Sequence, residues 1–162
     1  MRIPLTLLAL VAITASGGAL AMGSGNDQPA TAKPGPAAPP SDYARAKSMI
    51  EAKSYKDAIP LLQQVVAREP RNAEAYNLLG YATRKAGNPQ GSLQYYTTAL
   101  QIDPKHLGAN EYIGEAYLML DQPQQAEQHL ARLDQLCVFG CAEHRALKAA
   151  IANYKAGKKP TN

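Results

Sequence analysis

The sequence has none of the short motifs by which common enzyme classes are recognised. It contains no G-x-S-x-G, no H-E-x-x-H and no glycine-rich phosphate-binding loop. Its three histidines, His106, His129 and His144, do not stand beside a plausible nucleophile in the sequence. These absences argue against an enzyme, and nothing in the sequence calls for a cofactor or a small-molecule substrate.

Long apolar runs and a strong excess of charge are also missing from most of the chain. After Ala21, no apolar run is long enough to span a bilayer. The 17 basic and 13 acidic residues leave a formal net charge of +4, and part of the excess lies between Lys155 and Lys159. A charge this small does not predict a nucleic-acid-binding protein.

The segment 1–21 has the layout of a secretory signal. Arg2 precedes an apolar run from Leu5 to Ala15, and the segment ends in Ala19-Leu20-Ala21, which fits an A-x-A cleavage site. We therefore expect cleavage after Ala21 and a periplasmic or secreted mature protein. The alternative is an uncleaved membrane anchor.

The segment 22–40 differs in composition from the rest of the chain, because Gly, Ala, Pro and Ser dominate it. Such a segment cannot bury a core, so we expect a disordered linker. A proline-rich ligand is the alternative, but a P-x-x-P array with a flanking arginine is absent.

The remainder of the chain repeats itself at a spacing of about 34 residues. Small residues, large apolar residues and prolines each recur at that step. The recurring sets are Ala46, Gly80 and Gly114; Ala58, Ser92 and Ala126; Leu62, Tyr96 and Leu130; and Pro70 and Pro104. A fixed period of this size predicts a stack of helical hairpins, none of which can bury its apolar face alone.

The repeat resembles the tetratricopeptide repeat (TPR) family. The middle unit carries the resemblance best, through Tyr76, Leu79, Gly80, Ser92, Tyr96, Ala99 and Pro104. The resemblance implies an all-α fold, an α-solenoid of three hairpins over about 39–72, 73–106 and 107–140. A capping helix over 141–156 and a tail over 157–162 complete this domain, which begins near Ser41.

Local signals refine the helix boundaries. We predict helices over about 41–53, 55–68, 73–86, 89–102, 107–120, 123–136 and 141–156. Gly87 can take the left-handed conformation that ends a helix, Asn88 can cap the next helix, and Pro89 suits its first position. Pro60 lies inside the second predicted helix, where we expect it to remove a hydrogen bond and cause a kink.

Two cysteines, Cys137 and Cys141, flank a short turn between the third unit and the capping helix. In an exported protein they predict a disulfide that pins the capping helix to the stack. Two alternatives remain: reduced thiols, or a metal- or thiol-handling site that also uses His144. The C-x3-C spacing is not a strong zinc signal.

The family resemblance places the first helix of each hairpin on the concave face of the stack. The partner-binding candidates there are Tyr43, Lys47, Asn77, Tyr81, Arg84, Lys85, Glu111, Glu115, Leu118 and Met119. We expect Asn77, Tyr81 and Arg84 to hold a carboxylate or a peptide backbone, and Leu118 and Met119 to form an adaptable apolar patch. We also expect Arg84 and Lys85 to lie outside the core. Alternatively, these are ordinary solvated residues.

These observations predict a non-enzymatic adaptor or scaffold of the bacterial envelope that binds a protein or peptide partner. The alternatives are the metal- or thiol-handling protein centred on Cys137, Cys141 and His144, and a purely structural oligomer of stacked repeats. The sequence does not identify the partner.

Overall fold

The structure is a computed structural model, and it describes residues 41–160. The predicted signal segment, the predicted linker and the last two residues lie outside the described residues. Among the helices of residues 41–160, none combines the length and the apolar character needed to cross a bilayer.

Residues 41–160 form seven helices, and no strand occurs in this part of the chain. The helices are α1 (Asp42–Glu51), α2 (Tyr55–Arg68), α3 (Ala73–Lys85), α4 (Pro89–Ile102), α5 (Leu107–Met119), α6 (Pro123–Leu136) and α7 (Ala142–Lys155). Each agrees closely with a predicted range. The all-α prediction is confirmed.

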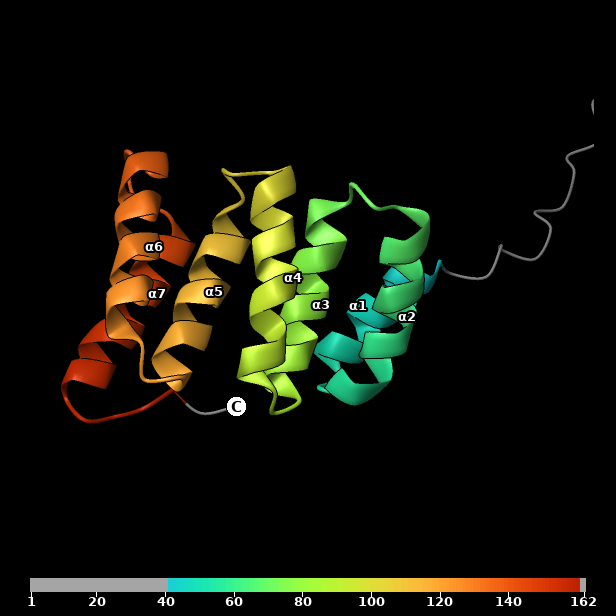
Figure 1. The fold of residues 1–162 in the computed structure, drawn as a ribbon, viewed down its shortest axis with the longest axis horizontal. Coiled ribbons are helices and arrows are strands. Elements are labelled where there is room, and N and C mark those ends of the chain that lie inside the picture. Colours follow the sequence, from blue (N-terminus) through green and yellow to red (C-terminus); the bar gives the residue numbers. More distant parts are fainter. Residues whose placement is uncertain (1–40, 161–162) are drawn as a thin grey trace, which may run out of the picture. The chain divides into compact units, whose positions relative to one another are not determined.

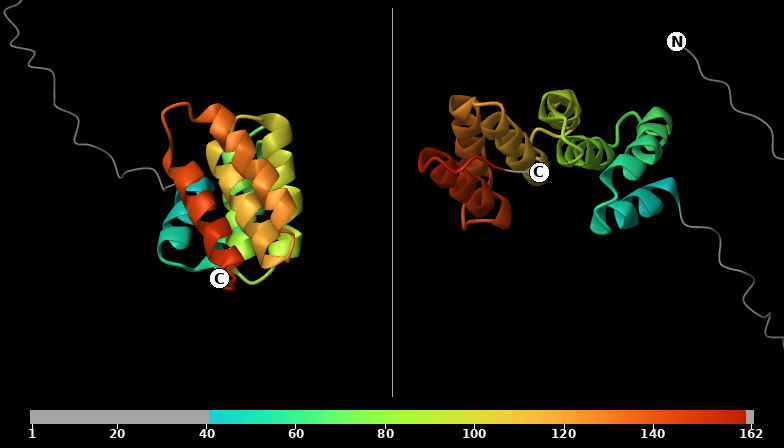
Figure 2. Two further views of the ribbon diagram at one scale, coloured as in Figure 1. Left: turned by 90° about the vertical axis from the view of Figure 1, so that its left-hand side faces the viewer. Right: turned by 90° about the horizontal axis from the view of Figure 1, so that it is seen from below.

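The helices pair as hairpins in chain order (Figure 1). The pairs are α1 with α2, α3 with α4, and α5 with α6, and α7 packs against both α5 and α6. Figure 2 shows that α2, α4 and α6 lie on one side of this helical unit, with α1, α3 and α7 on the other. The second helices of the three hairpins therefore form one common face.

Three hairpins end their first helix in the same way. Lys53, Gly87 and Asp121 recur at the period of the repeat and have positive φ angles of 61°, 98° and 59°. In each case the next amide hydrogen-bonds back into the last turn of the helix, as in Asn88 N–H to Thr83 O at 3.1 Å. The prediction for Gly87 is confirmed, but the same conformation at Lys53 and Asp121 was not predicted.

Side-chain caps begin several helices. The Asn88 side chain accepts from the Gly91 N–H at 2.8 Å and Pro89 follows it, as predicted. Asn72 and His106, which are also one repeat apart, cap α3 and α5 through the amides of Ala75 and Ala109. Pro60 does not end its helix, because α2 continues on both sides of it.

Two recurring glycines lie where helices pack closely together. A Cβ atom on Gly80 would lie 2.6 Å from Cε1 of Tyr96, which is fully buried in α4. A Cβ atom on Gly114 would lie 2.7 Å from the Cδ atoms of Leu147 in α7. Neither helix pair could approach so closely if these positions carried a side chain.

Candidate partner-binding groove between α3 and α5

One polar pocket lies between the first helices of the second and third hairpins. Its volume is about 390 Å³. We call it the α3–α5 groove, and its lining residues are Tyr81, Arg84, Lys85, Glu111, Tyr112, Glu115 and Pro160. The groove residues of each helix are three or four positions apart or adjacent, so helical periodicity brings them to one face.

Arg84 is the most deeply buried charged residue of the groove, with only 3% of its surface exposed. Its Nη2 atom pairs with Oε2 of Glu115 at 2.8 Å, and its Nε donates to the hydroxyl of Tyr96 at 3.4 Å. Its Nη1 contacts the sulfur of Met119 at 3.9 Å. The expectation that Arg84 lies outside the core was wrong, because its side chain is buried. Its charge is paired with Glu115.

Tyrosine rings surround the Arg84 guanidinium. Its Cζ atom lies 5.5 Å from the ring centroid of Tyr81 and 5.6 Å from that of Tyr112, which suits cation–π attraction. The Tyr81 and Tyr112 centroids are 4.9 Å apart, and Tyr55 meets Tyr81 edge-on at 6.0 Å. This aromatic cluster holds α3 and α5 in fixed relation across the groove.

Sequence reasoning missed Tyr112. The predicted set took Glu111 and Glu115 from this helix but not the tyrosine that follows Glu111 directly. Helical spacing was the available signal, because positions three and four apart, such as Tyr112 and Glu115, share a face.

Glu111 is a half-buried carboxyl that makes no ion pair with any described residue. Its burial raises its pKa to about 7, and the nearby charges of Glu115 and Glu143 add to the rise. Arg84 acts in the opposite direction. Near neutral pH, Glu111 is therefore a carboxyl whose charge is poorly compensated.

Two other predicted site residues are also buried. Leu118 is fully buried in a cluster with Leu133, Leu147 and Ile151, so it forms no apolar patch in the groove. The reason is that α7 packs on α5 and covers this position. Asn77 is only 3% exposed, and its Oδ1 has no hydrogen-bond partner among the described residues.

The remaining candidates are spread out rather than gathered. Lys85 is half-buried and lines the groove, and Met119 contacts Arg84 from α5. Tyr43 packs partly buried against the core of the first hairpin, and Lys47 is exposed on α1. The structure brings Tyr81, Arg84, Lys85, Glu111 and Glu115 together in the groove, whereas Asn77, Leu118 and the α1 candidates lie outside it.

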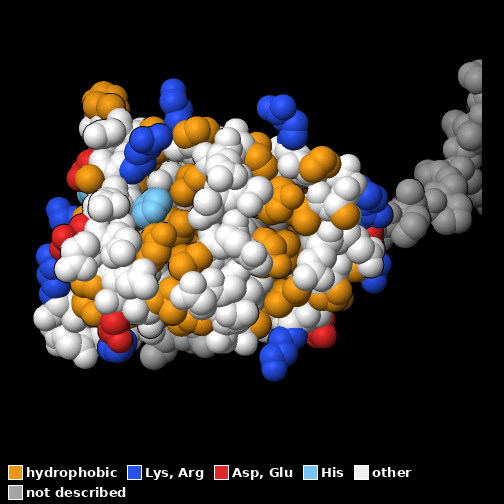
Figure 3. Space-filling view, viewed as in Figure 1, with side chains coloured by type: hydrophobic (Ala, Val, Ile, Leu, Met, Phe, Trp, Pro, Cys, Tyr) orange, Lys and Arg blue, Asp and Glu red, His pale blue; other side chains and the backbone are white. Residues whose placement is uncertain are grey.

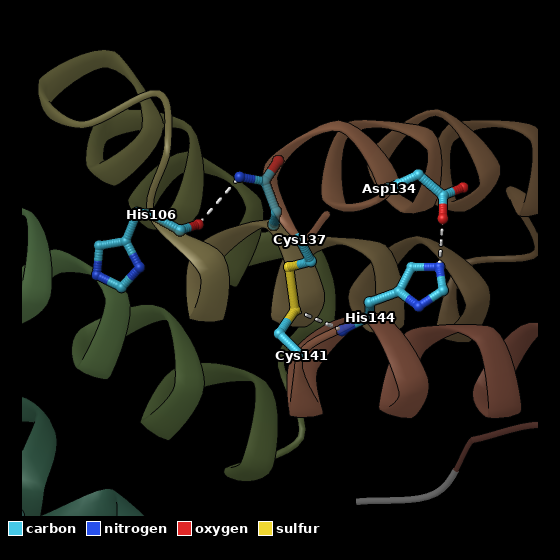
Figure 4. Close-up of a disulfide and its surroundings, with 6 residues drawn as sticks. His106, Asp134, Cys137, Cys141 and His144 are labelled. Carbon is cyan, nitrogen blue, oxygen red and sulfur yellow. Dashed lines mark hydrogen bonds and ion pairs between the residues drawn. A yellow bond between two sulfur atoms is a disulfide. The ribbon is translucent and has the colours of Figure 1, made fainter. Parts of the chain in front are cut away.

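The turn before α7 brings the sulfur atoms of Cys137 and Cys141 within bonding distance (Figure 4). Cys141 Sγ also accepts from the amide of His144 at 3.4 Å, at the start of α7. The His144 imidazole pairs through Nε2 with Oδ1 of Asp134 at 2.7 Å, so this ring nitrogen is directed at α6 rather than at the sulfurs. Within residues 41–160, no cluster of three or more potential metal ligands forms.

The tip of this turn exposes apolar side chains. Phe139, the only phenylalanine of the chain, is fully exposed, and Val138 is 79% exposed. Sequence reasoning did not single them out, because a short turn between cysteines gives no signal for the direction of its side chains.

The face formed by α2, α4 and α6 has a different character. Figure 3 shows hydrophobic side chains over the middle of this face and Lys and Arg mainly near its edges. A smaller pocket of about 250 Å³ there contains His129, whose Nδ1 lies 3.1 Å from Oδ1 of Asn110. Burial, assisted by Arg132, lowers the pKa of His129 to about 4, so this histidine is neutral at physiological pH.

The hairpin stack and its groove define an α-helical repeat protein. More narrowly, the chain belongs to the tetratricopeptide repeat family, because two models described as tetratricopeptide repeat match residues 43–106 and 83–151. This confirms the family resemblance that the sequence predicted. A comparison with curated proteins gives no match.

Solved structures give the same fold. MamA from Desulfovibrio magneticus RS-1 is 27% identical, with a TM-score of 0.57, over 59% of this chain and 54% of MamA. PcrH, solved with the chaperone-binding region of PopD, is 19% identical, with a TM-score of 0.64, over 72% of this chain and 90% of PcrH.

SycD, a type III secretion translocator chaperone of Yersinia enterocolitica, is 17% identical, with a TM-score of 0.64, over 72% of this chain and 82% of SycD. The present chain spans about half the length of the MamA structures. The family match and these neighbours agree on the fold.

Proposed function

We propose that this protein is a non-enzymatic adaptor that binds an extended segment of a protein partner in the α3–α5 groove. One observation carries the proposal. The first helices of two neighbouring hairpins place two tyrosine rings, a lysine and two carboxyls around a single open pocket. Ring faces supply contact area, and the polar groups fix a backbone or side chain, as peptide-binding grooves require.

The rigidity of this surface supports the same role. The ion pair of Arg84 with Glu115 and the contacts of Tyr81 with Tyr112 link α3 to α5 without any ligand. A groove that is already formed loses little conformational entropy when a peptide binds. PcrH, which shares the fold, was solved with a segment of another protein.

We place the protein in the bacterial envelope, in the periplasm or secreted, after cleavage near Ala21. The signal-like layout of the segment 1–21 and the bonding distance between the two cysteine sulfurs support this location. N-terminal sequencing of the mature protein and thiol titration after export test it. A retained leader together with two titratable thiols would contradict it.

Site-specific photo-crosslinking tests the binding surface. A photoreactive amino acid replaces Lys85, which lines the groove, or Gln94, which is exposed on α4. In cells that produce the protein, we expect a discrete crosslinked partner from position 85 and none from position 94. The same products from both positions, or a product from position 94 alone, would contradict the proposed groove.

A further inference from the structure

We propose that the α3–α5 groove selects a positively charged side chain, lysine or arginine, of the partner segment. The cation lies against Glu111 and the exposed part of the Tyr112 ring. This inference rests on the proposed function, since it names the chemistry of the segment that the groove binds. It reverses the expectation that Arg84 and its neighbours hold a carboxylate.

The groove's own arginine is unavailable to a ligand. Arg84 is almost completely buried, pairs with Glu115 and donates to Tyr96. Its planar group is also flanked by the rings of Tyr81 and Tyr112. An incoming carboxylate would have to displace Glu115 to reach it.

Apart from the pair of Arg84 with Glu115, the charge around Glu111 is negative. The groups that face Glu111 are Glu115 on its own helix, Glu143 from α7 and Arg84 from α3. With Arg84 and Glu115 balanced, two carboxyls remain, against Lys85 at the other side of the groove. Lys85 also lines a neighbouring pocket at the start of α2 and makes no ion pair with a described residue.

Glu111 itself makes no ion pair among the described residues. Partial burial and two neighbouring carboxyls raise its pKa to about 7. A cation that enters the groove restores the favourable environment of the ionised carboxylate. An anion in the same place would be repelled by Glu111 and Glu143, the two carboxyls that no cation balances.

Other features of the groove favour the same ligand. Tyr112 is half-buried, and a tyrosine ring attracts a cation placed over its face. The volume of about 390 Å³ lies within the range of roughly 300–1,000 Å³ for ligand pockets, so a long side chain fits in the groove.

Nuclear magnetic resonance titration of the mature protein tests this inference without a known partner. The probes are three blocked nonapeptides of alanine and serine with one central lysine, norleucine or glutamate. Norleucine keeps the length of the apolar stem but lacks the charge. At pH 8 we expect the lysine peptide to shift the amides of Tyr81, Glu111 and Tyr112, with a Kd about fivefold or more below that of the norleucine peptide.

A matched pair of variants assigns the effect to Glu111. Glu111→Gln should bring the Kd for the lysine peptide to within about twofold of that for the norleucine peptide. Glu127→Gln removes an exposed carboxylate from α6, where it pairs with Lys155, and should leave the preference unchanged. At pH 5 the wild-type preference should shrink, because Glu111 is then protonated.

The outcomes separate the two proposals. Equal binding of all three peptides at the groove, tighter binding of the glutamate peptide, or a preference that survives Glu111→Gln overturns the inference and leaves the peptide-binding groove intact. If no peptide shifts a groove residue and position 85 yields no crosslink, both proposals are wrong.

Discussion

The second and third hairpins place different chemistry at the same position of the repeat. Arg84 in α3 and Leu118 in α5 are one repeat apart, and both side chains are buried. Arg84 is held by Glu115 and tyrosine rings, whereas Leu118 packs among Leu133, Leu147 and Ile151. The period fixes where a residue lies, but the neighbouring helices decide what it contacts.

The two recurring glycines show the same difference. Gly80 is approached by Tyr96 of its own hairpin, and Gly114 by Leu147 of the capping helix. The second hairpin therefore closes on itself, whereas the third is completed by α7.

The largest effect is expected from reversing the buried charge of the second hairpin. Arg84→Glu breaks the pair with Glu115, leaves the Tyr96 hydroxyl without its donor and adds a like charge. We expect a loss of about 3–5 kcal/mol in the free energy of unfolding, measured by urea denaturation. Lys85→Glu is the control and should stay within about 0.5 kcal/mol of the wild type, because Lys85 makes no ion pair with a described residue. If Arg84→Glu also lost no more than about 0.5 kcal/mol, the buried contacts of Arg84 with Glu115 and Tyr96 would not contribute to stability as described.

The glycine contacts give the next largest effect. Gly80→Leu should cost roughly 1–3 kcal/mol or more, because a Cβ atom alone already lies 2.6 Å from Tyr96. For Gly114→Ala the opposing atoms belong to the flexible end of Leu147. Combining Gly114→Ala with Leu147→Ala should therefore show less than additive loss, whereas Leu147→Ala should not rescue Gly80→Leu. Additive losses for Gly114→Ala and Leu147→Ala would show that Gly114 does not pack against Leu147.

A smaller, pH-dependent effect is expected at Glu111. Its pKa in the folded protein is about 7, above the ordinary value of 4.5, so the wild type loses stability as the pH rises between these values. Glu111→Gln removes this loss. After allowance for solvent screening, we expect the variant to be more stable by about 1 kcal/mol at pH 8 and equal to the wild type at pH 4. Thermal melts across this range measure the difference, and a gain that grows toward low pH would be the wrong sign.

The smallest effect concerns the left-handed residues that end α1 and α5. Lys53→Gly should add about 0.5 kcal/mol to the free energy of unfolding, because the relief of left-handed strain is partly offset by the flexibility that glycine adds to the unfolded chain. Asp121→Gly should gain less, because the Asp121 carboxylate accepts from Tyr154 and Lys159. If both variants gain equally, the contacts of Asp121 contribute nothing.

The features of the fold that repeat were predictable from the sequence. The repeat period indicated the hairpins, and Gly87 with Asn88 and Pro89 indicated the end of one helix and the start of the next. These signals are local or periodic, so one chain is enough to reveal them. Lys53 and Asp121 were missed because a left-handed conformation is predictable from sequence mainly at glycine, and these two positions carry other residues.

The candidate site was predicted less well, because burial depends on neighbours that are distant in sequence. An arginine on the first helix of a hairpin looks the same whether it faces solvent or a ring of tyrosines. The burial of Leu118 depends on how α7 packs, which the repeat period does not report. For Tyr112 the only signal in the sequence was helical spacing. For the exposed Phe139 there was none.

Hydrogen–deuterium exchange tests the binding surface most directly. It compares the mature protein alone with its non-covalent complex with the partner that crosslinking identifies. We expect slower exchange in α3 (Ala73–Lys85) and α5 (Leu107–Met119), and little change in α2, α4 and α6. Protection confined to α2, α4 and α6, or to the turn between Cys137 and Cys141, would contradict binding in the α3–α5 groove.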